Sequence, residues 1–528
     1  MGKKIKFKKK VIKKGNSSFI FLLLHETDES IINSFLDLLS SFSKKGNRSS
    51  FIYRVSGERE FFIKSYTSPC FFNGIKNIFY PPRGIKEFFL LSSLKNKRDF
   101  IISPTMLIIR KRMKLPFDYW IVFPFAKDTI TFSDFLKVSN VKQKRDALLS
   151  LIMIVKSMHD MGIFHADLHP ENFLIDLNNN ERLYIVDFHR AKIKDKLNDN
   201  LRLKDIARLA ISIEEYLNLY ELAHMVSAYY GKKIDNQLKQ LLLMIKREKE
   251  ILLKRHLKRF LSPKYGVNFL RENKWRFFYL DNISVGDVRN WIEKEPENLI
   301  KDDKKTKIYL KSNGKDVCIK RFKLIGFFRF FKMILNSRAK KNWFNGWGLI
   351  KRGVNAPSPL AFGEKGKLLS KESIFIMEDL SHFPKLDHYI AKKFQSKGFT
   401  LKEKRDFVKS FAFFMKKLIF CLDIYHADLK TCNILVEEKK EGDWKFWLLD
   451  FDRIRFGKKV SKRRVIKNLV QLNNSTPRVF SLTNRIRFIK YMIKEKTYLK
   501  EIFQKVKKIS IEKPIIYTSP KGDVIERW

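Results

Sequence analysis

The chain has 528 residues, of which 108 are Lys or Arg and 56 are Asp or Glu, so its formal net charge at pH 7 is +52. This length suits two or three domains with cores of their own, and the 48 Phe residues argue against a disordered chain. The charge favours anionic partners such as nucleic acid, an acidic membrane surface or phosphorylated glycans, and it disfavours cationic substrates.

The four cysteines show no CxxC pair and no metal-ligand spacing, so we expect free thiols in a reducing compartment. The chain has no apolar run of about 18 residues, which a membrane-spanning helix requires. Near the start, "FIFLLL" (Phe19–Leu24) is too short for a secretory signal. We therefore expect a cytoplasmic protein, or one that is peripheral to a membrane.

The first half of the chain predicts a series of elements that carry polar residues. The apolar strand "EFFIKSY" contains Lys64, and "GIKEFFLLSSL" offers Glu87 either as a helix partner for that lysine or as a solvated residue. Apolar residues at three-to-four spacing then predict a core helix over residues 146–162. The loop "HADLHPENFLID" (His165–Asp176) follows, and after it the strand "LYIVDFHRA", with Asp187.

The second half predicts the same elements in the same order. The strand "VCIKRF" contains Lys320, and "AKKNWFN" places Asn342 where the first half has Glu87. An apolar helix is predicted over Arg405–Leu422. The loop "HADLKTCNILVE" (His426–Glu437) and the strand "FWLLDFDRI", with Asp450, complete the set.

The intervals between these residues are nearly equal in the two halves. A single H-x-D-x-x-x-x-N match is a weak signal, but two matches, each with a strand lysine before it and a strand aspartate after it, are strong. The repeat has the size of a whole domain, which excludes a solenoid. The sequence therefore predicts two tandem domains, residues 1–265 and 266–528.

These residue types suit phosphoryl transfer from a nucleotide, which requires charge neutralisation and alignment. A strand lysine holds the phosphates, a loop carboxylate takes the acceptor proton, and an amide oxygen and a second carboxylate hold Mg²⁺. The candidate catalytic bases are Asp167 and Asp428. The candidate phosphate-binding lysines are Lys64 and Lys320. The candidate Mg²⁺ ligands are Asn172, Asp187, Asn433 and Asp450. We expect His165 and His426 to brace the loops.

This is the order of parts in protein kinases, which implies an α+β fold of two bilobal domains, each with a strand-rich lobe above a larger helical lobe. The chain departs from eukaryotic protein kinases because the loop reads HAD, the metal motif reads "DFH" or "DFD", and no APE segment follows. A large protein substrate is therefore not expected. Each half also lacks one part. Asn342 weakens the anchoring of Lys320, and His169 stands where the second half has Lys430, a residue that could reach the γ-phosphate of ATP.

A closer resemblance appears in the second half, which is similar to the lipopolysaccharide kinase family (Kdo kinases and core heptose kinases). It covers most of residues 300–495 and is carried by Ser337–Ala361, "HADLKTCNILV", "LLDFDRIRF" and Lys467–Met492. In the first half, Glu250–Gly266 resembles the closing Arg-Phe helix of the same family.

The resemblance implies an enzyme that uses ATP and Mg²⁺ to phosphorylate a sugar hydroxyl, of Kdo or heptose, in the lipopolysaccharide inner core. The partner would be an anionic glycolipid (lipid A–Kdo or heptosylated core) at the cytoplasmic face of the inner membrane, with no obligatory nucleic acid. Two alternatives stay open. One is an aminoglycoside-type phosphotransferase, which "HADLHPEN" alone would permit. The other is a non-catalytic basic scaffold that binds membrane or nucleic acid.

Overall fold

The structure is a computed structural model of the chain, which forms two compact units, Met1–Lys249 and Glu250–Trp528. The units divide inside helix α8 (Asp235–Arg259), whereas the predicted domains divide at residue 265. The residues that the structure describes are 7–14, 17–24, 29–40, 48–55, 59–67, 83–94, 99–112, 115–178, 182–231, 234–293, 298–303, 306–312, 315–323, 337–366, 372–440, 442–519 and 522–528.

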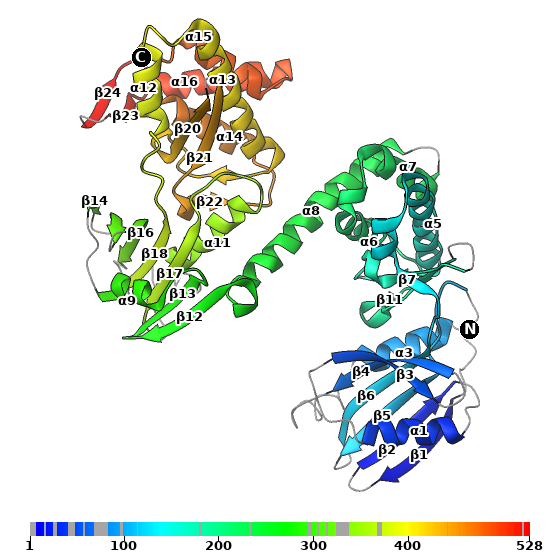
Figure 1. The fold of residues 1–528 in the computed structure, drawn as a ribbon. Coiled ribbons are helices and arrows are strands. Elements are labelled where there is room, and N and C mark those ends of the chain that lie inside the picture. Colours follow the sequence, from blue (N-terminus) through cyan, green and yellow to red (C-terminus); the bar gives the residue numbers. More distant parts are fainter. Residues whose placement is uncertain are drawn as a thin grey trace. The chain divides into compact units, whose positions relative to one another are not determined.

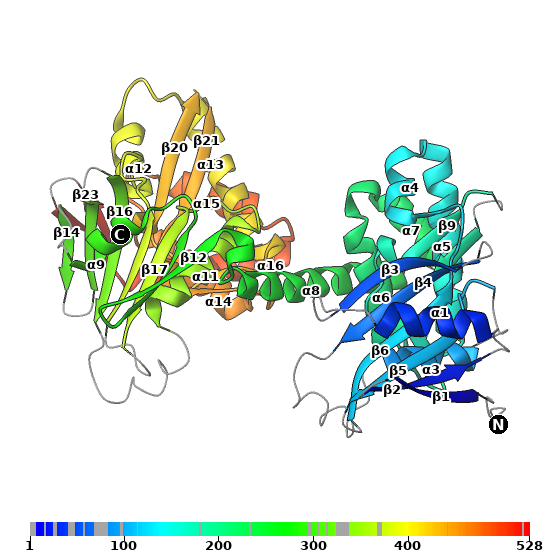
Figure 2. The ribbon, with the colours of Figure 1, turned by 60° about the horizontal axis from the view of Figure 1, so that its bottom comes forward.

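The first unit begins with a six-stranded antiparallel sheet in the order β1-β2-β5-β6-β4-β3. Its strands are β1 Lys8–Lys14, β2 Ser17–Leu23, β3 Arg48–Val55, β4 Arg59–Thr67, β5 Met106–Arg112 and β6 Leu115–Pro124. Helix α1 (Glu29–Ser40) packs its apolar residues against one face of the sheet, and α3 (Arg83–Leu94) packs against the other (Figures 1 and 2). This lobe therefore has a core on each face of its sheet.

The second unit begins with a seven-stranded sheet in the order β12-β13-β17-β18-β16-β15-β14. Its strands are β12 Val267–Glu272, β13 Trp275–Leu280, β14 Leu299–Asp303, β15 Thr306–Ser312, β16 Lys315–Lys323, β17 Pro359–Lys365 and β18 Glu372–Glu378. Helix α9 (Val285–Glu293) packs on one face through Trp291. Helix α11 (Arg338–Ile350) packs on the other through Trp343 (Figure 1).

The two sheets have the same topology. If β12 is matched to β1 and the strands are followed in chain order, six strands correspond one to one, and β14 is an addition at the edge of the second sheet. The helix that follows the second strand (α1 or α9) covers the equivalent face in both copies. The duplication therefore extends to N-terminal elements for which the sequence showed no matching motif. The strands that carry Lys64 and Lys320 form the hairpins β3–β4 and β15–β16, as the glycine-containing turns "VSGE" and "SNGK" before them predict. The turn glycines, Gly57 and Gly314, lie outside the described residues.

The second lobe of each unit is mainly helical. In the first unit it contains β7 Thr129–Thr131, α4 Phe132–Val138, α5 Val141–Asp160, β8 Ile163–Phe164, β9 Phe173–Asp176, β10 Arg182–Ile185, β11 Lys192–Ile193, α6 Asp199–Ser212, α7 Leu219–Tyr230 and the start of α8. In the second unit it contains α12 Leu386–Gln395, α13 Leu401–Lys416, β19 Tyr425–His426, β20 Ile434–Lys440, β21 Asp443–Leu448, β22 Ile454–Arg455, α14 Lys462–Asn473, α15 Leu482–Met492, α16 Lys496–Ile511, β23 Ile515–Ser519 and β24 Gly522–Glu526.

The central helix of each helical lobe forms where the apolar spacing predicted it. Helix α5 begins at a capping box of Asn140 and Gln143, and α13 begins at one of Thr400 and Glu403. The buried residues of α5 recur at the spacing of one helix face, as in Leu148, Leu151 and Ile152. Helix α13 ends in a π-helical turn, Lys417–Cys421, just before the loop that carries Asp428.

The element order corrects one expectation. We expected Glu250–Gly266 to be the counterpart of the closing Arg-Phe helix of the second half. That helix is α15, and its counterpart by element order is α7, because α6, α7 and α8 correspond to α14, α15 and α16. The end of α8 and α15 are both basic helices with an apolar stripe, so composition alone did not distinguish α8 from the true counterpart of α15. The residues after α16 form the hairpin β23–β24.

Arg485 on α15 holds a turn of the second unit together. Its guanidinium is buried and donates hydrogen bonds to the backbone oxygens of Asn473, Thr476, Pro477 and Phe480 at 2.7–3.0 Å. Burial lowers the pKa of this group to about 10. A buried arginine with its donors satisfied by carbonyls fixes the path of the chain between α14 and α15.

We expect Arg485→Leu to lower the free energy of unfolding of the second unit by about 3 kcal/mol, because several buried carbonyls lose their donor. Urea unfolding of the full chain, followed by tryptophan fluorescence, would measure the loss. The matched control is Lys490→Leu, an exposed position on the same helix. Equal stability of the two variants would contradict the role given to Arg485.

Candidate active site

The histidine of each HAD loop is buried behind the loop. His165 Nε2 lies 3.2 Å from the carbonyl oxygen of Val186, and His426 Nε2 lies 3.1 Å from that of Leu449. Burial lowers the pKa of both imidazoles. A neutral ring that donates to the strand leading to Asp187 or Asp450 braces the loop, as the sequence analysis expected.

In the first unit the loop backbone is also held by Asp205 of α6. This carboxylate is fully buried and accepts hydrogen bonds from the backbone N–H groups of His165 (2.8 Å) and Ala166 (3.0 Å). Ala166 has a φ of 66°, in the left-handed region. Arg208 of the same helix donates to the Ala166 carbonyl and pairs with Glu248 at 2.9 Å. These contacts stabilise a strained loop conformation just before Asp167.

The second unit holds its loop through two amides of α14. Asn468 Nδ2 donates to the carbonyl of His426 at 2.6 Å, and Gln471 Nε2 donates to that of Ala427 at 3.0 Å. Both amides lie in the segment "KNLVQLNNS", one of the segments that carry the family resemblance, so residues of this segment hold the loop. The two copies therefore hold the loop from the same helix. Arg208 and Gln471 both donate to the carbonyl of the loop alanine, whereas Asp205 accepts from loop N–H groups and Asn468 donates to a loop carbonyl.

The loop aspartate and asparagine adopt the same arrangement in both copies. Asn172 Nδ2 donates to the backbone oxygen of Asp167 at 2.9 Å, and Asn433 Nδ2 donates to that of Asp428 at 2.8 Å. The backbone oxygen of each asparagine accepts a hydrogen bond from the backbone N–H of the residue just before the second aspartate, which is Val186 in the first copy and Leu449 in the second. The loop and the strand that leads to the second carboxylate are thereby fixed to each other.

The first unit brings its lysine, glutamate and second aspartate together. Lys64 Nζ lies 2.8 Å from Glu87 Oε1 and 3.1 Å from Asp187 Oδ1. Tyr66 donates to the other oxygen of Glu87 at 2.7 Å. The expected ion pair between Lys64 and Glu87 is present, and the side chain of Glu87 is 0% exposed, which excludes the solvated alternative.

The second unit lacks this ion pair. Lys320 Nζ lies 3.7 Å from Asp450 Oδ1. Asn342 donates back to the Arg338 carbonyl of its own helix at 2.8 Å, and its buried Oδ1 has no hydrogen-bond partner within the described parts of the chain. Arg338 instead binds Asp452 through Nε (3.1 Å) and an Nη atom (2.7 Å). Helix α11 is therefore tied to the segment after Asp450 by an arginine rather than through the lysine.

The donor sets suit Mg²⁺, which prefers oxygen ligands and is usually held by one or two carboxylates together with substrate phosphates. Asp187 with Asn172, and Asp450 with Asn433, supply a carboxylate and an amide oxygen each. Both aspartates have a left-handed backbone, with φ of 65° and 57°. Across the described ranges, no group of three or more His, Cys, Asp or Glu side chains forms a metal site by itself.

A cation lies beside the loop carboxylate in both copies, but it comes from different chain positions. In the second unit, Lys430 Nζ lies 3.6 Å from Asp428 Oδ1. In the first unit, an Nη atom of Arg190 lies 2.9 Å from Asp167 Oδ1. His169, at the position of Lys430, lies near Glu171, with 4.0 Å between Nδ1 and Oε2.

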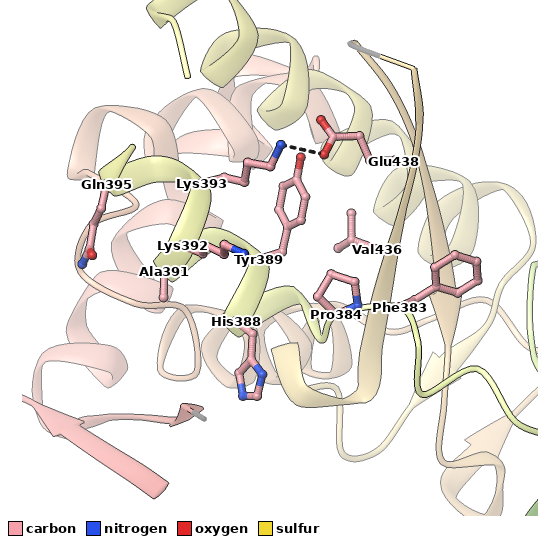
Figure 3. Close-up of a pocket in the computed structure, with 10 residues that line it drawn as sticks. All are labelled: Phe383, Pro384, His388, Tyr389, Ala391, Lys392, Lys393, Gln395, Val436 and Glu438. Atoms are coloured by element: carbon pink, nitrogen blue, oxygen red, sulfur yellow. Dashed lines mark ion pairs between the residues drawn. The ribbon is translucent and has the colours of Figure 1, made fainter. Parts of the chain in front are cut away.

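A cavity of about 780 Å³ lies apart from these residues, between α12 and β20 of the second unit (Figure 3). Tyr389 and Val436 line it, and an ion pair of 2.9 Å between Lys393 and Glu438 lies at its edge. None of the predicted site residues lines this cavity.

Comparison with known proteins agrees with the motifs. The model of the lipopolysaccharide kinase (Kdo/WaaP) family matches residues 49–229 and 330–491. The matches cover more than half of the chain and fall once in each unit, so the chain belongs to this family and has two tandem protein-kinase-like domains.

Two individual proteins are also similar to parts of the chain. The EKC/KEOPS complex subunit BUD32 of Enterocytozoon bieneusi (strain H348) is 27% identical over 111 residues, which are 20% of this chain and 52% of that protein. The chain thus matches about half the length of this curated relative. A solved structure of WaaP in complex with acyl carrier protein is similar with 17% identity and a TM-score of 0.33, covering 40% of this chain and 88% of that one.

Sequence reasoning missed several residues that shape the site. Asp205, Arg190 and the ion pair of Arg338 with Asp452 were not predicted. Asp205 lies in an ordinary amphipathic helix, and only its spacing from the loop could have drawn attention to it. Arg190 and Asp452 follow the candidate metal ligands Asp187 and Asp450 by three and two residues, where charged residues are usually taken to be solvent-exposed.

We expect Asp205→Asn to weaken the loop of the first unit, because the new amide group meets two backbone donors with a single acceptor. The free energy of unfolding of this unit should fall by about 2–3 kcal/mol, and the amides of His165 and Ala166 should exchange hydrogen faster. Hydrogen exchange with mass spectrometry would detect this. Asp195→Asn, at an exposed position, is the control. Unchanged exchange at the loop would contradict the account.

The buried histidines make the folded chain sensitive to acid. The unfolded chain binds protons near the usual histidine pKa of about 6.5, whereas burial lowers the folded pKa of His165 and His426. The stabilisation is therefore complete above about pH 6.5 and is lost as the pH falls below it. We expect a loss of up to about 1.4 kcal/mol per pH unit for each histidine.

Denaturant unfolding at a series of pH values would measure this dependence. His426→Asn should flatten the dependence for the second unit, whereas His382→Asn, at an exposed position, should leave it unchanged. Stability that does not vary between pH 7 and pH 5 would show that the two histidines are protonated equally in the folded and unfolded chain.

Proposed function

We propose that the chain is an ATP-dependent carbohydrate kinase that transfers the γ-phosphate to a Kdo or heptose hydroxyl of the lipopolysaccharide inner core. Family membership supports a phosphotransferase. The observation that carries the proposal is the contact of Lys64 with both Glu87 and Asp187, since this network presents a cation for nucleotide phosphates next to a carboxylate for the metal.

We assign the roles in each domain as follows. Lys64, supported by Glu87, and Lys320 bind the ATP phosphates, and Lys430 reaches the γ-phosphate in the second domain. Asn172 with Asp187, and Asn433 with Asp450, would hold Mg²⁺, which would neutralise charge on the ATP phosphates. Asp167 and Asp428 each orient an acceptor hydroxyl and accept its proton.

The charge supports the choice of acceptor. The inner core and lipid A–Kdo are polyanionic, which matches a chain of net charge +52. A protein of this charge is attracted to an anionic membrane surface, so we place it at the cytoplasmic face of the inner membrane. Among the described residues, no helix combines the length and hydropathy of a membrane span.

The two alternatives explain less. Aminoglycosides are cations, so a strongly basic chain would repel them. A scaffold without catalysis would not require Lys64 to be buried between two carboxylates, because such a network is costly to maintain in the folded state. Family membership also favours a phosphotransferase over a scaffold.

The test is transfer of labelled phosphate from ATP to purified lipid A–Kdo and heptosylated core acceptors. Asp167→Asn and Asp428→Asn should each lower the rate of one transfer by about 10³-fold, because each removes a proton acceptor. Asp195→Asn and Asp443→Asn, at exposed positions outside the loops, are the matched controls.

Which phosphate each variant fails to transfer shows which domain phosphorylates which hydroxyl. If each variant removes a different phosphate, both domains are active on different hydroxyls. If one variant abolishes all transfer, only that domain transfers phosphate to these acceptors. No transfer by the unmodified protein to any of these acceptors would contradict the proposed substrate.

A further inference from the structure

The first domain lacks the loop lysine that the second domain has. Lys430 follows Asp428 by two residues and lies 3.6 Å from its carboxylate, whereas the same position in the first domain is His169. Burial does not force His169 toward Asp167, since its side chain is 35% exposed and its near neighbour is Glu171. The first domain therefore needs another cation if its chemistry is that of the second.

Arg190 is in the position to supply it. One Nη atom of Arg190 lies 2.9 Å from Asp167 Oδ1, which is closer than Lys430 lies to Asp428. Arg190 ends a short 3₁₀ turn that begins at the buried Phe188, and the turn is closed by a 2.9 Å bond from the N–H of Ala191 to the Phe188 carbonyl. The backbone of Arg190 is thus fixed three residues after Asp187, while its side chain stays 48% exposed.

This exposure matters because a group that meets substrate must be accessible. Asp167 is also partly exposed, at 29%. The acceptor hydroxyl that Asp167 would orient must approach the γ-phosphate in line, so a cation beside Asp167 is also close to the transferred phosphoryl group. A guanidinium matches phosphate oxygens bidentately, which an imidazole does not.

We propose that Arg190 is a catalytic residue of the first domain and binds the transferred phosphoryl group there without a loop lysine, whereas the second domain has both Lys430 and, at the position of Arg190, Arg453. The inference rests on the proposed function. In the step, the acceptor oxygen forms a bond to the γ-phosphorus and its proton passes to Asp167. The bond from the γ-phosphorus to the bridging oxygen breaks, and its electron pair leaves with ADP. Arg190 neutralises charge on the phosphoryl oxygens as they pass between the two.

The test uses the full chain with Asp450→Ala, so that the second domain lacks its metal carboxylate and the first domain is measured alone. In this background, Arg190→Met should lower kcat for phosphate transfer by about 10²-fold, with the Kd for Mg·ATP changed less than about threefold. Arg182→Met is the matched control, because Arg182 also pairs with an exposed aspartate, Asp99, at 3.4 Å.

A rescue separates this role from a merely structural one. His169→Lys restores at the loop the cation that the second domain has there, so adding it to Arg190→Met should recover at least about tenfold of the lost kcat. A loss of less than about threefold on Arg190→Met, or the same loss on Arg182→Met, would overturn the proposal. So would a double variant with no recovery.

A second measurement does not depend on the acceptor. ADP with aluminium fluoride and Mg²⁺ mimics the transferred phosphoryl group, and calorimetry gives its Kd. Arg190→Met should weaken this complex by about 10²-fold and leave the Kd for Mg·ADP unchanged. If the parent chain transfers nothing to the sugars tested, the proposed substrate fails, but this comparison still decides the role of Arg190. Equal weakening of both complexes would overturn it.

Discussion

The buried ammonium of Lys64 is the constraint on which the first active site depends. An isolated charge in this place would cost several kcal/mol, so it must be paired. Glu87 comes from α3 on one side and Asp187 from the helical lobe on the other. The Nζ atom of Lys64 therefore links α3 of the sheet lobe to the helical lobe. If nucleotide phosphates bound Lys64 and a metal ion bound Asp187, each of these charges would still have a partner of opposite sign.

The second copy pairs its lysine with one carboxylate and fastens its helix with other residues. Because Asn342 carries no charge, Lys320 has only Asp450 as a carboxylate within the described residues, at 3.7 Å. The helix is fastened instead by Arg338, which binds Asp452 two residues beyond Asp450. Gly346 on the same helix lets the helix pack closely against Phe451, because a Cβ at this position would lie 2.9 Å from the ring of Phe451. Each copy has thus kept the arrangement while exchanging individual residues.

The sequence predicted the site better than the frame around it. The spacing of Lys64, Asp167 and Asp187 indicated phosphoryl transfer because few chemistries need these groups in this order. The strands β1, β2, β12 and β13, by contrast, were not foreseen. Strand β1 consists mostly of lysine, and β2 and β13 join their sheets by pairing with β5 and β17, which lie far along the chain, so periodicity does not reveal their place.

The sequence also did not reveal the residues whose side chains hold the backbone of the HAD loops. Asp205 and Asn468 do similar work with opposite polarity, so neither the residue type nor a shared motif reveals the role. Arg190 was missed for another reason. No spacing rule links it to Asp167, which lies 23 residues earlier, and an arginine in a chain with 108 basic residues carries little information by itself.

The central claim is that each unit forms a site for Mg·ATP. Isothermal titration of the full chain with a non-hydrolysable ATP analogue and Mg²⁺ tests it most directly. The account predicts two sites for the unmodified chain and one site for each of Lys64→Met and Lys320→Met, with the tighter site lost on Lys64→Met because Lys64 is held by two carboxylates. Binding that is absent, or a stoichiometry that neither substitution changes, would contradict it.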